Sequence, residues 1–136
     1  MTPFMMIFFG ALFWLLFGHA IADFALQSDS MAKGKNFRNP IDPDKVPPGQ
    51  KPQVCWYYWM ASHCIIHAGM VTMITGSIFL GIAEFVLHFI ADCLKCAGVG
   101  NIHTDQFFHV ACKILWAFFA ADGGLVNVPS NDGQPG

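Results

Sequence analysis

Residues 84–96 read EFVLHFIADCLKC, an apolar stretch in which ionisable side chains recur at helical spacing. Starting from Glu84, the ionisable side chains follow at +4, +8 and +11, and they are His88, Asp92 and Lys95. An α-helix places residues with these spacings on one face. The stretch therefore predicts a helix that carries one polar stripe on an otherwise apolar surface.

The spacing of four residues between two ionisable side chains also occurs in three other apolar segments. The four pairs are His19 and Asp23, His63 and His67, His88 and Asp92, and Asp105 and His109. An ionisable group in such a segment is costly unless it faces the interior of a bundle, where it usually has a function. We therefore expect four helices that gather these pairs around one polar site.

The composition is typical of an integral membrane protein. Hydrophobic residues make up 54% of the 136 residues and charged residues only 12%, whereas a soluble domain carries about 25% charged residues. The length predicts a single domain. The net charge of -2, without a basic cluster on any expected helix, argues against a nucleic-acid partner. The five cysteines lie in or beside apolar segments, where we expect packing rather than disulfides or a zinc site.

Four apolar segments predict an all-α fold, a four-helix transmembrane bundle with a long first loop. The expected helices cover about residues 3–27, 54–75, 77–96 and 104–121, the last of them capped by Thr104. A span of about 20 residues crosses the hydrocarbon core of a bilayer. Residues 1–121 thus form one helical domain, and 122–136 are expected to be a flexible C-terminal tail. A cleaved signal peptide is the alternative for the first segment, although the segment lacks a basic amino-terminal region.

Residues 28–53 differ in composition from the segments on either side. Five of the eight prolines and five of the seven basic residues fall here. Proline at this density predicts a loop rather than a continuous helix. Because basic residues favour the cytoplasmic side of a membrane, this loop and Lys95 place both connections inside and both termini outside the inner membrane.

The expected up-and-down arrangement brings the four pairs to one level near the cytoplasmic face. Counting residues from the predicted turns places His67 level with His88. The same count places Asp92 level with both His63 and His109. Side chains from separate helices should therefore surround one point.

The chemistry of these side chains suits a metal ion. Imidazole and carboxylate groups on facing helices are ligands for Zn²⁺, Fe²⁺ or Mn²⁺. We predict a site for one or two divalent transition-metal ions, with Zn²⁺ the first choice and Fe or Mn as alternatives. The eight expected metal ligands are His19, Asp23, His63, His67, His88, Asp92, Asp105 and His109.

Three residues of one helical face are candidate catalytic groups. Glu84 lies one helical turn deeper than the expected ligands and is a candidate general acid or base, as is Asp92. Lys95 is expected to neutralise an anionic substrate group such as phosphate. The alternative for Lys95 is a cation at a helix end that only sets the topology.

Three further residues are expected to support the ligands from outside. Gln27 and Gln106 continue two of the ligand faces and are expected to orient ligands or substrate. The alternative for both glutamines is that of polar residues at the membrane interface. Lys113 shares a face with the last pair and is expected to form an ion pair with Glu84.

The four motifs read HAIADFALQ from His19, HCIIH from His63, HFIADCLK from His88 and DQFFH from Asp105. Their combined order resembles a bacterial and phage family of small membrane proteins of unknown function, over roughly residues 15–115. More distantly, it is similar to the membrane-bound metal-dependent hydrolases, which also place His and Asp on short hydrophobic helices. The resemblance implies a multi-helix membrane protein and favours a bound metal, but it implies no particular reaction.

Three functions are compatible with such a site. The first is a metal-dependent hydrolase of a lipid-like or phosphate-bearing substrate, in which the ion lowers the pKa of bound water. The second is transport of protons or metal ions, although the outer halves of the expected helices are almost wholly apolar. The third is a non-catalytic bundle that holds a haem or only fixes helix pairing. The expected partners are the lipid bilayer and the substrate, and a homo-oligomer is left open.

Overall fold

The computed structural model describes residues 1–39, 41, 44 and 46–123. Within these residues the chain is helical and contains no strand, which confirms the all-α prediction. The helical elements are α1 (Pro3–Ala20), the π-helical turn η1 (Ile21–Ala25), α2 (Asp29–Gly34), α3 (Trp56–Thr75), α4 (Ile78–Cys96) and α5 (Ile102–Ala121). The predicted C-terminal tail lies outside the described residues from position 124 onward.

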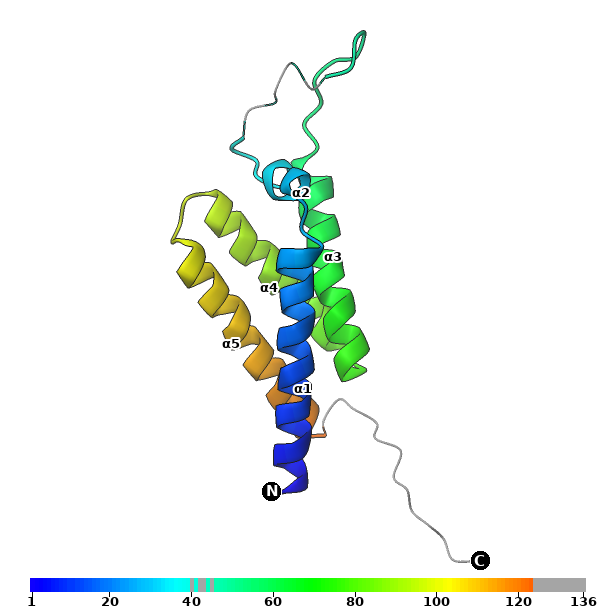
Figure 1. Ribbon diagram of the computed structural model, residues 1–136, viewed down its shortest axis with the longest axis vertical. Helices are drawn as coiled ribbons and strands as arrows, with labels where there is room; N and C mark the ends of the chain where they lie inside the picture. The colour runs from blue at the N-terminus through cyan, green and yellow to red at the C-terminus, as the bar shows by residue number, and fades with distance from the viewer. Residues whose placement is uncertain (40, 42–43, 45, 124–136) are drawn as a thin grey trace, which may run out of the picture.

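The four long helices α1, α3, α4 and α5 form an up-and-down bundle (Figure 1). α3 packs most extensively against α4, and α1 against α5. The N-terminus and the turn between α3 and α4 lie at one end of the bundle, whereas the connection between α4 and α5 lies at the other. α2 also lies at this second end, where it contacts α3. The order and direction of the long helices are those that the sequence predicted.

Two residues make the turn between α3 and α4. Gly76 ends α3 with a φ of 72°, a left-handed conformation that glycine adopts without strain. The Ser77 side chain then accepts a hydrogen bond from the backbone N–H of Leu80 and so caps α4. The predicted division of the chain near Gly76 is confirmed.

α5 begins at Ile102, before the predicted start at residue 104. The Asn101 side chain accepts hydrogen bonds from the backbone N–H groups of His103 and Thr104. In return, the Thr104 hydroxyl accepts a hydrogen bond from the backbone N–H of Asn101. This reciprocal capping box makes Asn101 the N-cap, so the prediction that Thr104 caps the helix is wrong.

A short helix, α2, occupies the beginning of the segment 28–53 that was predicted to be a loop. Ser28 caps it by accepting a hydrogen bond from the backbone N–H of Met31. All five prolines of the segment lie beyond residue 39, so proline does not prevent a helix in its first part. Gly34 packs closely on α3, because a Cβ atom at this position would lie 2.6 Å from the Trp59 ring. The prediction of a loop over the whole segment is therefore wrong.

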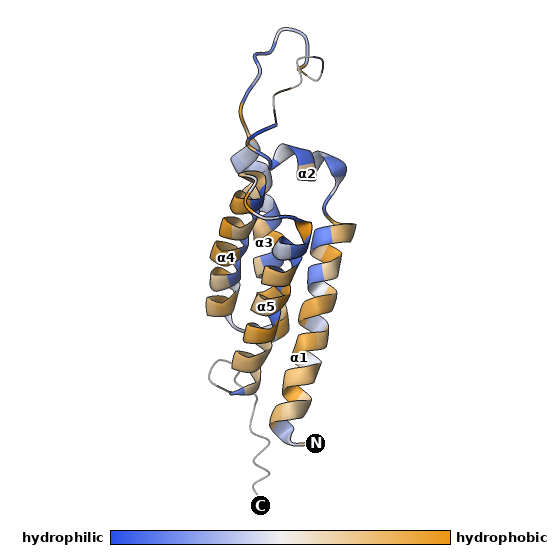
Figure 2. Ribbon diagram, turned by 90° about the vertical axis from the view of Figure 1, so that its left-hand side faces the viewer, coloured by the Kyte–Doolittle hydropathy of each residue, from blue (hydrophilic) through white to orange (hydrophobic). Residues whose placement is uncertain are grey.

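A layer of polar side chains lies inside the bundle, and many large apolar side chains lie on its outside. Histidine, aspartate, glutamate and lysine side chains contributed by the long helices are buried. Large apolar side chains point outward instead, and Phe13, Met73 and Phe79 are 62%, 82% and 72% exposed. Figure 2 shows how strongly apolar the ribbons of α1, α4 and α5 are. Large exposed apolar patches are rare on soluble monomers and mark interaction with a membrane or another protein.

One helical stretch of the described chain is long and apolar enough to cross a membrane, namely Pro3–Ala25, which joins α1 and η1. As a single stretch near the N-terminus it is weak evidence for a membrane. The other long helices contain the charged residues of the polar layer, which lower their mean hydropathy. α4, for example, carries Glu84, Asp92 and Lys95. A helical bundle is thus established, whereas its insertion into a membrane stays a prediction.

The bundle also contains two clusters of buried apolar residues. The cluster toward the N-terminal end consists of Leu15, Val71, Leu80, Cys112, Trp116 and Ala117. The second cluster consists of Met60, Cys64 and Cys96, with Cys93 packed against it. The predicted packing role of Cys93 and Cys96 agrees with their place in this cluster.

Candidate metal centre

The eight predicted ligands lie at one level of the bundle, and all are buried. Their exposed fractions range from 0% to 7%. The rings of His67 and His88 stack with their centroids 3.7 Å apart. His63 Nε2 lies 3.5 Å from Asp92 Oδ2, and His109 Nε2 lies 3.8 Å from Asp92 Oδ1. These contacts confirm the levels that residue counting predicted.

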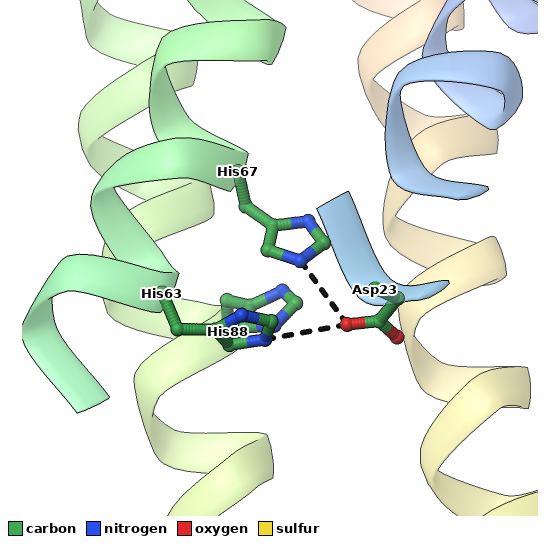
Figure 3. Close-up of side chains that lie close together, drawn as sticks. All are labelled: Asp23, His63, His67 and His88. Atoms are coloured by element: carbon green, nitrogen blue, oxygen red, sulfur yellow. Dashed lines mark hydrogen bonds and ion pairs between the residues drawn. The ribbon is translucent and has the colours of Figure 1, made fainter. Parts of the chain in front are cut away.

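Four of these residues converge on one point (Figure 3). Asp23 Oδ1 lies 3.2 Å from the Nε2 atoms of both His63 and His67. His63 Nε2 also lies 3.2 Å from His88 Nε2. One ligand atom of each residue lies within 4.8 Å of those of the other three. We call these residues, Asp23, His63, His67 and His88, the Asp23 group.

The Asp23 group has the donor atoms and the spacing that a tetrahedral metal ion needs. Zn²⁺ binds imidazole nitrogen and carboxylate oxygen at about 2.0–2.2 Å, so neighbouring ligand atoms around it lie roughly 3.3 Å apart. The three distances of 3.2 Å within the group are close to this edge length. Because the same donors suit Fe²⁺ or Mn²⁺, the geometry fits a class of metal ions rather than one element.

The same atoms form a hydrogen-bond network when no ion lies between them. The Asp23 carboxylate only accepts, so His63 and His67 then donate their Nε2 protons to it. His63 Nδ1 is buried and makes no hydrogen bond in the described structure. The arrangement is therefore suited chemically either to holding a divalent cation or to sharing protons among imidazoles.

The π-helical turn η1 determines where Asp23 lies. A π-helical turn is wider than an α-helical one, because its hydrogen bonds join residues five apart, as the 2.8 Å bond from the Leu26 N–H to the Ile21 carbonyl does. The Gln27 side chain donates to the Asp23 backbone carbonyl at 3.2 Å. Gln27 therefore supports the backbone of this turn rather than a ligand atom. The helix predicted over residues 3–27 covers this turn, but the prediction did not include the change to π-helical hydrogen bonding after Ala20.

Glu84 orients His88 from behind the Asp23 group. Its Oε1 lies 3.2 Å from His88 Nδ1, and since a carboxylate accepts, this nitrogen donates and Nε2 keeps its lone pair for a metal. Oε1 also accepts from Lys113 Nζ at 2.5 Å, and Oε2 accepts from Trp116 Nε1 at 2.7 Å. The predicted pair of Lys113 and Glu84 is thus confirmed. Because both Glu84 oxygens are occupied, the geometry favours an orienting role over the predicted acid–base role.

A second set of three ligands, which we call the Asp92 group, consists of His88, Asp92 and His109. Lys35 Nζ donates to Asp92 Oδ2 at 2.5 Å, and Lys95 Nζ lies 3.2 Å from Asp92 Oδ1. The two groups share His88, and its Nδ1 is already engaged by a carboxylate. Only Nε2 remains for a metal, so His88 serves one ion at a time. This arrangement favours one bound ion over two.

His19 and Asp105 belong to neither group of ligands. Gln106 connects His19 to Asp23, because its Oε1 accepts from His19 Nε2 at 3.1 Å and its Nε2 donates to Asp23 Oδ2 at 2.8 Å. Asp105 accepts a hydrogen bond from Lys95 Nζ at 2.6 Å. Both predicted ligands therefore lie in supporting positions, whereas the predicted orienting role of Gln106 agrees with its contacts.

Charge balance distinguishes Asp23 from the other buried carboxylates. The pairs of carboxylate and lysine are Glu84 with Lys113, Asp92 with Lys35, and Asp105 with Lys95. Among the described residues, Asp23 forms ion pairs only with histidines. If the imidazoles are neutral, the layer contains four negative carboxylates and three positive ammonium groups. One negative charge is then unbalanced, and it lies at Asp23, the carboxylate without a lysine partner. Because an uncompensated buried charge is strongly unfavourable, a cation at this point would stabilise the bundle.

A pocket of about 390 Å³ opens between α4 and α5 beside the ion pair of Lys95 and Asp105. Its walls are mainly apolar and include Ile90, Leu94 and Phe108. The Lys95 side chain is 28% exposed, the most accessible of the three lysines that pair with site carboxylates. The pocket therefore offers an apolar surface and an ionic group next to each other.

In comparisons with known proteins, no family model, no curated protein and no solved structure matches this chain. The resemblance to small membrane proteins of bacteria and phages stays a prediction. Function is therefore inferred from the geometry and the charge of the site.

Lys35 and Trp116 are residues of the site that sequence reasoning missed. Trp116 lies eleven positions after Asp105, the step that joins Glu84 to Lys95, so helical periodicity did contain a signal for it. Lys35 had no such signal, because 57 positions separate it from Asp92. Its segment was interpreted only as a source of basic residues that set the topology.

Proposed function

We propose that the protein is a membrane-embedded hydrolase that depends on one divalent metal ion, with Zn²⁺ the first choice. The observation that carries this proposal is the convergence of three imidazole nitrogens and one carboxylate oxygen in the buried Asp23 group, with spacings of 3.2 Å. The unbalanced negative charge of Asp23 supplies an electrostatic reason for a cation at this point.

The three imidazoles and the carboxylate of the Asp23 group would hold the ion. A bound ion with a coordination position open to water would lower the pKa of that water molecule toward neutrality. Hydrolysis would transfer the oxygen of a water molecule to a carbonyl or phosphoryl centre, break the bond from that centre to the leaving oxygen, and deliver a proton to the leaving oxygen. Asp92 lies next to the group, with Oδ2 3.5 Å from His63 Nε2. Its Oδ1 makes no hydrogen bond in the described structure, so this oxygen is the candidate to move the proton.

Insertion of all four long helices into the inner membrane is part of the proposal. The apolar exterior of the bundle and its buried charges suit lipid as the surrounding medium. The basic residues near α2 favour a cytoplasmic position for that end of the bundle. In this orientation both termini are outside, and the metal ion lies close to the inner leaflet.

The pocket between α4 and α5 favours an amphipathic substrate. Its apolar walls suit an acyl chain, while Lys95 is placed to bind an anionic group at the inner end of that chain. Lys95 hydrogen-bonds to Asp105, whose Oδ1 lies 3.3 Å from His109 Nε2, so the pocket adjoins the polar layer. We therefore propose a lipid-like substrate that carries a phosphate group.

Transport of protons or metal ions is the second candidate, because the histidines and carboxylates form a connected network. On the side of the N-terminus, however, the described residues continue as an apolar cluster that contains Leu15, Val71 and Leu80. A transport route needs polar groups or water on both sides of the site, whereas hydrolysis needs access from one side only. The asymmetry of the bundle favours hydrolysis.

Measurement of bound metal tests the proposal directly. Protein extracted gently in detergent is expected to hold about one transition-metal ion per chain. The double variant His63→Ala/His67→Ala should lose it, because half of the ligands are gone. His103→Ala is the matched control, since His103 is exposed at the beginning of α5. Wild-type protein without a stoichiometric metal, or a double variant that keeps it, would contradict the metal site.

Hydrolysis is measured separately, on lipid phosphates in mixed micelles. Lys95→Met should slow the release of phosphate while leaving the metal content unchanged, because Lys95 touches no atom of the Asp23 group in the described structure. A metal-loaded protein that releases neither phosphate from lipid phosphates nor acid from lipid esters would identify the ion as structural and would refute the hydrolase.

A further inference from the structure

Lys35, the residue that follows α2, is a buried cation whose side chain reaches the polar site. The residue is 3% exposed, whereas no residue of α2 itself is buried. Its Nζ lies 2.5 Å from Asp92 Oδ2, deep within the polar layer. The close packing of Gly34 on Trp59 fixes the preceding residue. α2 therefore presents one side chain to the site, and this side chain ends on a carboxylate of the Asp92 group.

The Asp92 group has the character of a metal site in its own right. Two imidazoles and one carboxylate form it, and sets of three ligands with an open position are typical of catalytic zinc. His109 Nε2 and Asp92 Oδ1 are buried and make no hydrogen bond in the described chain. Lys95 Nζ lies 3.2 Å from Asp92 Oδ1 but is closer to Asp105, at 2.6 Å. Lys35 is thus the closest cation to Asp92.

An ammonium group and a divalent ion on one carboxylate repel each other. Lys35 neutralises Asp92 and removes the electrostatic attraction that would draw a metal to its group. The Asp23 group has no ammonium group within ion-pair distance among the described residues. Because both groups need Nε2 of His88, an ion in one excludes an ion from the other.

We propose that the buried ammonium group of Lys35 prevents a metal ion from binding to the Asp92 group. The ion therefore binds only to the Asp23 group. This inference rests on the proposed metal site. The inference follows from the count of buried charges: the metal ion binds to the group whose carboxylate has no lysine partner. The unbalanced negative charge lies at Asp23 in the natural chain, is absent in Asp23→Asn, and reappears at Asp92 in Asp23→Asn/Lys35→Met.

The experiment measures Zn²⁺ content and affinity in these variants, with helix content followed by circular dichroism. Asp23→Asn is expected to lose the ion, and Asp23→Asn/Lys35→Met is expected to regain about one ion per chain. Asp23→Asn/Lys33→Met is the matched control and should stay empty, because Lys33 pairs with Asp29 on the exposed side of α2. Asp23→Asn/Lys35→Arg keeps the positive charge and should stay empty as well.

A further variant locates the regained ion. Adding Asp92→Asn to Asp23→Asn/Lys35→Met should abolish binding again, since the only unbalanced carboxylate is then removed. If methionine at position 35 reduces the helix content, Asp23→Asn/Lys35→Gln carries the same test. A folded double variant that stays without Zn²⁺, while wild-type protein holds it, overturns the inference but leaves the proposed function intact. Wild-type protein that binds no ion overturns both.

Discussion

His88 is held by a relay of side chains that begins outside the metal ligands. Lys113 and Trp116 both donate to Glu84, and Glu84 in turn accepts from His88 Nδ1. A carboxylate behind a ligating histidine fixes its tautomer and raises its basicity. The relay therefore leaves Nε2 of His88 as a ready ligand, and it makes Glu84 a positioning residue.

Replacement of Glu84 tests this relay. We expect Glu84→Gln to weaken metal binding about 10- to 100-fold, the usual effect of losing such a partner, as measured by competition with a chelator. The change also leaves Lys113 as an unpaired buried charge, which should lower the free energy of unfolding by about 3–5 kcal/mol. Glu84→Gln/Lys113→Met should recover stability without recovering affinity.

Asp29→Asn is the control for Glu84→Gln. Asp29 also pairs with a lysine, but the pair lies on the surface, with exposed fractions of 63% and 81% for the side chains of Lys33 and Asp29. A pair of this kind contributes little to stability, so neither affinity nor stability should change. Full metal affinity in Glu84→Gln would show that Glu84 does not act through His88.

The two glutamines that were predicted to orient ligands differ in what they contact. Gln106 donates to the Asp23 carboxylate, whereas Gln27 donates to the backbone carbonyl of the same residue. A hydrogen bond to a charged group contributes about 1.5–3 kcal/mol. We therefore expect Gln106→Ala to weaken metal binding more than Gln27→Ala does, measured in parallel by chelator competition. Equal losses would contradict the assigned contacts.

Helical periodicity explains why the sequence predicted the buried layer so completely. Two side chains four residues apart share a face whatever surrounds the helix, so the levels of His67, His88 and Asp92 follow from counting. The division of these residues into ligands and supporting groups does not follow from counting. It depends on Lys35 and on the turn at Asp23, and both reflect contacts between distant parts of the chain.

α2 and η1 are the elements that the sequence did not predict, and both adjust the site. η1 interrupts a continuous apolar run by a change of hydrogen-bonding pattern, for which periodicity contains no signal. α2 is a single turn and a half between polar residues, held in place by packing of Gly34 on α3 and by one buried lysine. Short elements of this kind are stabilised by tertiary contacts rather than by propensity.

Gly34→Ala tests the docking of α2. A Cβ atom at this position would come within 2.6 Å of the Trp59 ring, so α2 must move away, at a cost of about 1–3 kcal/mol. We expect faster amide hydrogen exchange over residues 28–35, measured by mass spectrometry. Gly69→Ala in α3 is the control, because its Cβ would meet no atom within 4 Å. Unchanged exchange in Gly34→Ala would show that α2 is not anchored there.

If the bundle is inserted into a membrane as proposed, the distribution of side chains over the whole bundle predicts its topology. The ends of α1 and α5 that approach the termini lie opposite α2 (Figure 1), so both termini should be outside if α2 is cytoplasmic. Alkaline phosphatase fused to the C-terminus should therefore be active, whereas a green fluorescent protein fused there should stay dark. The same reporters inserted next to Gln50 should behave in the opposite way. A fluorescent C-terminal fusion would contradict this orientation.

Length and composition alone identify one apolar stretch in the described chain. The spacing of ionisable residues predicted all four long helices of the bundle. The pattern of ionisable pairs identified the polar face of each helix, and the apolar remainder identified the outer surface. The mean hydropathy of a helix averages its polar inner face and its apolar outer face. The mean hydropathy of α4 is therefore lowered by Glu84 and Asp92, which are buried inside the bundle, although Phe79 is exposed outside. Only the arrangement of four helices separates the two faces in space.

The ion pairs between α4 and α5 have a consequence for biogenesis. Glu84 pairs with Lys113, and Lys95 pairs with Asp105, so each helix carries the counter-charges of the other. A lone charged residue at the centre of a bilayer costs about 2.5–3.5 kcal/mol on translocon-derived scales. If the bundle is inserted into a membrane as proposed, α4 should therefore wait at the translocon until α5 emerges. The two would then enter the lipid together with one unmatched negative charge, because the partner of Asp92 is Lys35, which lies outside this hairpin.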